Sequence, residues 1–132
     1  MAIQLSVAVR NARLDAIEST ISTSPKLRIY SGSAPADCAT AASGTMLCEM
    51  TLPSDWLANA ASGSKAKSGT WSGTAAATGT AGYFRIWDSA VSACGLQGTC
   101  GIGTGDLQLD NTSIATSQTV TVTSFSLSDA NA

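Results

Sequence analysis

Cysteine has the widest chemistry of any residue type in this sequence, which contains Cys38, Cys48, Cys94 and Cys100. Paired thiols form disulfides, and four thiolates can hold zinc. Zinc knuckles place about two to four residues between paired cysteines, and neither close pair has that gap. We therefore favour disulfides or free thiols over zinc. Of the three connectivities that four cysteines allow, we predict Cys38–Cys48 and Cys94–Cys100, because each closes a short glycine-containing loop at low entropic cost.

The sequence contains no histidine, which limits the catalysis that it supports. Most serine and cysteine nucleophiles depend on an imidazole base, and imidazole is also the commonest metal ligand. Ser64 and Lys67 have the spacing of a Ser-x-x-Lys motif, but that motif requires a helix with an apolar side. Here the two residues stand in a Gly/Ser-rich stretch. We therefore predict that the chain is not an enzyme.

A glycine run and a few acidic turn residues are the remaining features that bind ligands in other proteins. Residues 101–106 (GIGTGD) are similar to a phosphate-binding run, but an alternating strand pattern follows them where a helix is needed, which favours a hairpin turn. Asp106, Asp110 and Asn111 carry oxygens that suit Ca²⁺, although such residues more often cap their own backbone. The sequence thus predicts no cofactor and no metal ion.

Large side chains suggest a contact surface. Trp71 stands between glycines in a stretch of small residues and needs a partner surface, inside or outside the chain. The strand pattern at 83–88 places Phe84 and Ile86 on one face and three large residues on the other, which indicates a central strand or an interface. The candidate interface residues are Trp71, Tyr83, Arg85 and Trp87.

One amphipathic helix is predicted near the N-terminus, over residues 6–22. Apolar residues recur there at steps of three and four, with Ser6 as the N-cap and Pro25 ending the pattern. The apolar stripe consists of Ile3, just ahead of the helix, and of Val7, Leu14, Ile17 and Ile21.

The rest of the chain, 26–128, is predicted to be β-rich. Alternating patterns mark strands at 26–31, 45–52, 83–88, 106–110 and 119–128, and Pro53 begins a short helical turn. In the last strand the apolar residues change parity, so we expect a β-bulge near 123–124.

The Ala/Ser/Gly/Thr-rich stretch 58–82 is expected to be flexible, with a short edge strand at Trp71 as the alternative. The elements predict a single domain, 1–132, that folds as an antiparallel sandwich or small barrel.

Composition restricts the partners. The 132 residues are 44% hydrophobic and only 12% charged, and the formal net charge is −2. Seven scattered Lys and Arg residues form no basic patch for nucleic acid. We find neither a basic leader nor an apolar run long enough to cross a bilayer, and so expect a soluble protein made in a cytoplasm, with no membrane partner.

Several segments together make the chain similar to the small structural proteins of tailed bacteriophages. They are the helix region Ser6 to Ile21, the strands Leu27 to Gly32 and Phe84 to Asp88, and the C-terminal segments Asp110 to Ile114 and Gln118 to Phe125. The resemblance implies a virion protein, either a capsid decoration (cement) protein or a tail component. It implies no catalytic residues. It also accounts for disulfides in a protein made in the reducing host cytoplasm, since oxidation follows lysis.

We therefore expect a capsid decoration protein that binds the outer capsid surface, in many copies or as a homo-oligomer, and stabilises the shell. Its partners would be the major capsid protein or other virion proteins. The alternative is a tail or tail-fibre module that binds host glycans through aromatic side chains.

Overall fold

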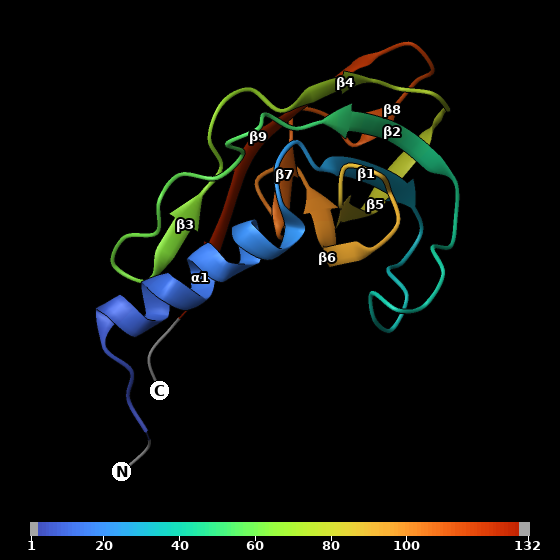
Figure 1. Cartoon of the computed structure of the whole chain (residues 1–132). Helices are drawn as coiled ribbons and strands as arrows, with labels where there is room; N and C mark the ends of the chain where they lie inside the picture. Colours follow the sequence, from blue (N-terminus) through green and yellow to red (C-terminus); the bar gives the residue numbers. More distant parts are fainter. Residues whose placement is uncertain (1–2, 130–132) are drawn as a thin grey trace.

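A curled mixed sheet with one helix lying beside it forms the body of the molecule in the computed structural model, which describes residues 3–129 (Figure 1). Within this range the chain is 43% strand and 12% helix. The elements are α1 (Val7–Ile21), β1 (Lys26–Ser31), β2 (Met46–Thr51), β3 (Ser64–Ala66), β4 (Ser72–Thr74), β5 (Gly79–Trp87), β6 (Cys94–Gly101), β7 (Leu107–Leu109), β8 (Ser113–Ile114) and β9 (Thr119–Ser128).

The strands form a curled half-barrel in the order β2-β1-β5-β6-β7-β9-β3, with β4 paired to β9 and β8 paired to β5. All described pairs are antiparallel except β6 with β7, where Cys100 lies opposite Leu107 in parallel register. The predicted mainly β fold with one N-terminal helix is confirmed. The expected antiparallel sandwich or small barrel is not confirmed, because the sheet is a mixed half-barrel. Residues 101–106, which we expected to form a hairpin turn, connect two parallel strands.

The helix α1 begins where its sequence signal places it. Ser6 is the N-cap, and its hydroxyl accepts a hydrogen bond from the Val9 N–H at 3.2 Å, which satisfies one of the free donors of the first turn. Leu14 and Ile21 are buried, but Val7 remains 47% exposed. The helix therefore buries apolar side chains against the sheet from Leu14 onward, and its apolar stripe is only partly covered.

β-Bulges explain which side chains enter the core. Between β1 and β2 the register shifts at Leu47, so that Leu47 and Cys48 are both fully buried. Between β7 and β9 it shifts at Thr123, and this keeps Val122 and Phe125 on the same buried side. The bulge predicted for the last strand is therefore confirmed.

The small-residue stretch 58–82 contains strands β3, β4 and the start of β5, so the expectation of a plain loop is wrong there. Hydrogen bonds to other segments hold it: the Lys67 N–H donates to the Phe125 carbonyl oxygen at 2.9 Å. The turn that we expected to be helical after Pro53 is a bend. Across residues 3–129, no helix combines the length and apolar character that crossing a membrane requires.

Candidate functional site

Trp71 is a core residue, which corrects the expectation that it offers a contact surface. Its ring centroid lies 6.0 Å from that of Trp56 and 5.5 Å from that of Phe125, and its side chain is fully buried. The indole N–H donates to the Ser68 carbonyl oxygen at 3.0 Å. The partner surface that Trp71 needs is therefore inside the chain.

Tyr83 is also buried, because the loop between β1 and β2 covers the second face of β5. Its ring stacks on Tyr30 with centroids 4.9 Å apart. Its hydroxyl donates to the Ser43 carbonyl oxygen at 2.6 Å and accepts from the Ser43 N–H at 3.0 Å. Of the two alternatives for this strand, the structure shows a central strand, with β5 between β1 and β6, and Tyr83 is not available as an interface residue.

Arg85 is fully buried and serves as an anchor for the same loop. Its guanidinium donates to the carbonyl oxygens of Asp37 at 3.1 Å and Thr40 at 2.7 Å, and its Nε donates to Gln97 at 3.1 Å. Gln97 in turn donates to the Pro35 carbonyl oxygen at 2.8 Å. A buried guanidinium needs several acceptors, and backbone oxygens of the loop supply them. Arg85 is thus unavailable to a partner.

The cysteines do not form the predicted pairs, and all four are free thiols. Cys94 and Cys100 lie on one strand, β6, so at about 3.3 Å per residue their Cα atoms are about 20 Å apart, against the roughly 4–7 Å that a disulfide needs. Cys48 is fully buried in the core, where burial and then the Glu49 charge raise its pKa to about 11. The predictions Cys38–Cys48 and Cys94–Cys100 are therefore wrong for this structure.

Four of the eight predicted site residues meet in one hollow, which we call the cysteine pocket. It has a volume of about 500 Å³. The predicted residues that line it are Cys38, Arg85, Trp87 and Cys94. The Arg85 guanidinium carbon lies 5.5 Å from the centre of the Trp87 ring, and the Trp87 indole N–H has no hydrogen-bond partner among residues 3–129.

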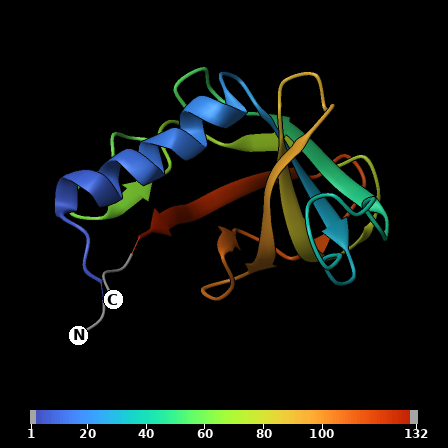
Figure 2. The same cartoon turned by 60° about the horizontal axis from the view of Figure 1, so that its bottom comes forward.

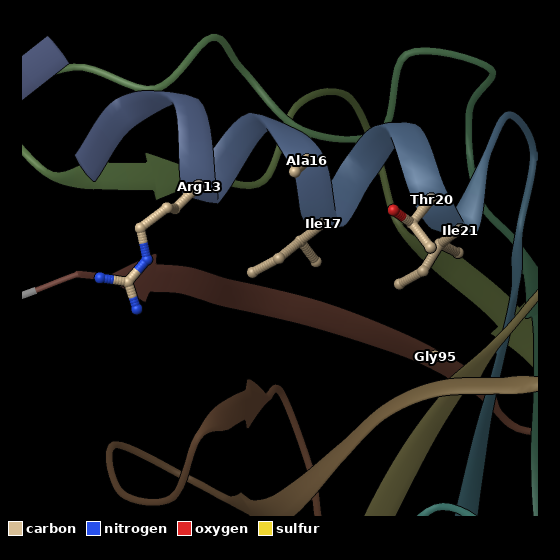
Figure 3. A pocket seen from close by; sticks show the side chains of 6 residues that line it. All are labelled: Arg13, Ala16, Ile17, Thr20, Ile21 and Gly95. Carbon is tan, nitrogen blue, oxygen red and sulfur yellow. The ribbon is translucent and has the colours of Figure 1, made fainter. Parts of the chain in front are cut away.

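A second hollow lies between α1 and β6 and was not foreseen from the sequence; we call it the helix groove (Figure 3). It has a volume of about 280 Å³ and is lined by Arg13, Ala16, Ile17, Thr20, Ile21 and Gly95. Figure 3 shows the Ile17 and Ile21 side chains pointing from the helix toward the strands. The Arg13 side chain points the same way, one turn before Ile17 along the helix.

Gly95 permits the close approach of helix and sheet at this groove. It is the extra residue of a β-bulge opposite Ile86 and Trp87. A Cβ atom there would lie 2.5 Å from Cγ1 of Ile21, so a larger residue would push the helix away. A separate hollow of about 320 Å³ shares Arg13 and Ile17 with the helix groove, and Arg13 Nε there lies 3.2 Å from an Asp129 carboxylate oxygen.

The sequence carried a weak signal for this groove. Val9, Arg13, Ala16, Ile17 and Thr20 follow one another at helical spacing, but small and polar members make the row look like an ordinary solvated face. Ile17 and Ile21 also belong to the predicted apolar stripe, so the groove lies along one edge of that stripe.

Lys67 of the Ser-x-x-Lys spacing and the acidic turn residue Asp106 both have structural roles. Lys67 Nζ donates to the Gly69 carbonyl oxygen at 2.8 Å, and no bond links it to Ser64 among the described contacts. Asp106 accepts from the Thr99 N–H at 2.9 Å and so closes its own loop. Residues 3–129 hold no cluster of three or more Cys, Asp or Glu arranged to bind a metal ion.

Comparisons of the chain with protein-family models, with curated proteins and with solved structures find no match.

Proposed function

We propose that this chain is a structural protein of a tailed-phage virion, a capsid decoration protein that docks on the shell through the helix groove. The observation that carries the proposal is the groove itself, an apolar hollow beside a helix that the sheet covers on one side only. Ile17 and Ile21 form its floor, and Ala16 and Thr20 form a low rim that a partner can approach closely.

The surroundings of the groove suit a protein partner. Val9 is 46% exposed and lies on the same side of α1, seven residues before Ala16, so the apolar row extends beyond the groove. Exposed apolar rows rimmed by polar residues are typical of protein–protein contact sites. Weak binding at each copy is sufficient for a decoration protein, because stabilisation of the shell sums over many copies.

The alternative, a tail module that binds glycans, has less support from the side chains. Glycan stacking needs exposed aromatic rings, yet every aromatic residue of the chain except Trp87 is buried. Trp87 is half-buried within the cysteine pocket. The aromatic residues therefore serve the core of this molecule.

An arginine placed in the groove tests the proposal. Ala16→Arg puts a long charged side chain on the rim of the groove, and Ala12→Arg is the matched control, an exposed alanine one turn earlier that does not line it. Purified variants are mixed with particles stripped of this chain and sedimented. We expect A16R to reduce bound protein at least about tenfold, the effect of about 1.4 kcal/mol, and A12R to bind as the wild type does.

Equal binding by wild type, A16R and A12R would contradict the groove as the docking surface. Failure of the wild-type chain to bind particles at all would contradict the decoration role itself. Circular dichroism of each variant verifies that both arginines leave the fold unchanged.

A further inference from the structure

Cys38 is held in place by strand β5 rather than by its own loop. The loop 32–45 joins β1 to β2, and buried Arg85 binds the carbonyl oxygens of Asp37 and Thr40 on either side of Cys38. Because a fully buried guanidinium cannot give up these acceptors cheaply, the loop backbone is fixed relative to β5 and β6. The position of the Cys38 thiol is therefore set by the sheet.

The residue that faces Cys38 is Cys94, at the start of β6. The two side chains line the same cysteine pocket, and the Cys94 thiol donates to the Leu96 carbonyl oxygen at 3.5 Å. Cys94 lies opposite Trp87 in the β5–β6 pair, so it too is held by the sheet. Both thiols are partly exposed, and an oxidant in solution can reach them.

We propose that Cys38 and Cys94 form a disulfide that ties the loop 32–45 to the β5–β6 hairpin once the protein meets an oxidising solution. The oxidant is a small-molecule disulfide such as oxidised glutathione. The Cys38 thiolate attacks one of its sulfurs, which forms a mixed disulfide and releases one glutathione thiolate. The Cys94 thiolate then attacks Sγ of Cys38 and releases the second. Two electrons pass from the protein to glutathione, and the two thiol protons end on the released thiolates.

Burial of Cys94 slows the second step of this reaction. Burial is the largest cause that raises the pKa of the Cys94 thiol, and it persists when Cys38 is in the mixed disulfide, whereas the contribution of the Cys38 thiol does not. Only the thiolate is a nucleophile, so the step in which Cys94 attacks gains about tenfold in rate per pH unit between neutral and mildly alkaline solution. The bond would therefore form slowly in a reducing cytoplasm and accumulate afterwards.

Intact mass and peptide mapping test the pairing in the native chain. The protein is incubated with oxidised glutathione, denatured, alkylated without reductant and cleaved with chymotrypsin, whose cuts after Leu47, Trp87 and Leu96 separate all four cysteines. We expect two alkylated thiols, at Cys48 and Cys100, and one cross-linked peptide that joins Cys38 to Cys94. The thermal midpoint of the oxidised protein should rise by several degrees and return on reduction.

Variants separate the roles of the two thiols. Cys94→Ser should keep one glutathione on Cys38, since nothing resolves the mixed disulfide, and Cys100→Ser is the control that should form the bond as the wild type does. Four alkylated thiols in the oxidised wild type, a stable glutathione adduct on it, or a cross-link to Cys48 or Cys100 would overturn the proposal. Because the mapping uses the wild-type chain, it decides the matter even if a variant fails to fold.

Discussion

At the scale of single residues, what decides the fold is how closely backbone segments approach, and Gly82 is the clearest case. It is the extra residue of a β-bulge between β1 and β5. A Cβ atom there would lie 1.8 Å from the Gly32 carbonyl oxygen and 2.9 Å from the Gly32 nitrogen. Backbone atoms cannot turn aside as a side chain does, so this position requires glycine.

We predict that Gly82→Ala destabilises the protein by about 3 kcal/mol, because the two segments must separate. The control is Gly103→Ala: Gly103 has φ +68° and open space around it, so this change carries only the cost of a left-handed backbone, about 1 kcal/mol. Urea unfolding of both variants measures the difference. Equal losses would show that the contact at Gly82 relaxes freely.

The candidate site was predictable at this scale only in part. The large residues of β5 and the cysteines were identified from the sequence, and four of them do meet in one pocket. Their burial was not foreseen, because alternation along β5 shows two large faces and does not show that a distant loop covers one of them. The partner of Cys38 was missed for the same reason, since loop length ranks cysteine pairs without knowledge of the sheet.

At the scale of elements, a buried lysine joins the helix to the sheet. Lys65 of β3 is 1% exposed, and its Nζ lies 2.6 Å from an Asp15 carboxylate oxygen and 2.8 Å from one of Glu18. A third bond goes to the Ala58 carbonyl oxygen at 2.9 Å. The three acceptors satisfy an ammonium group that would otherwise be costly to bury.

This contact makes the helix–sheet junction sensitive to acid. The hydrogen bond from Lys65 is the largest cause that lowers the pKa of Asp15 in the folded protein. A carboxylate with a lowered pKa contributes stability above its unfolded value, about 3.9, and that contribution is lost as the pH falls below it. We expect Lys65→Met to remove this part of the pH dependence.

Urea midpoints between pH 6 and pH 2.5 provide the measurement. The control is Lys67→Met, two residues along, where Nζ binds the Gly69 carbonyl oxygen and lies 5.9 Å from the centre of the Trp71 ring, with no carboxylate among its described contacts. The loss of stability on acidification should be smaller in K65M than in wild type, and unchanged in K67M. Parallel pH curves for all three proteins would mean that Asp15 gains nothing from Lys65.

Elements with strong local patterns were predictable, and those without were not. The helix, β1, β2 and the bulge in β9 follow from capping, alternation and the change of parity after Val122. Strands β3 and β4 were not predicted, because most of their side chains are small and show no alternation of size. The parallel pairing of β6 with β7 was not predicted, because the alternation of apolar residues shows which face a strand buries but not which strand pairs with it.

At the scale of the whole molecule, the helix lies at one side of the curled sheet and meets the end of β9 (Figure 2). Arg10 of α1 donates to the Asp129 carbonyl oxygen at 3.1 Å, which fixes the first half of the helix against the C-terminal strand. Most of the aromatic side chains are buried in the half-barrel. The surface that remains for a partner is weakly charged, and its apolar features include the helix groove and the exposed side chains of Val7 and Ile102.

Such a surface suits many weak, identical contacts better than one tight contact. A shell presents the same subunit junction repeatedly, so modest binding at each copy adds to a large total. The weak net charge of −2 fits docking by apolar contact better than electrostatic capture of a polyanion.

The copy number of the chain in purified virions, relative to the major capsid protein, tests this account most directly. Quantitative mass spectrometry of intact particles supplies both amounts. A decoration protein that occupies repeated shell positions predicts about one copy for every few capsid subunits, on the order of hundreds per particle. A few dozen copies or fewer would contradict the decoration role and place the chain in the tail, and its absence from the particles would contradict a virion function.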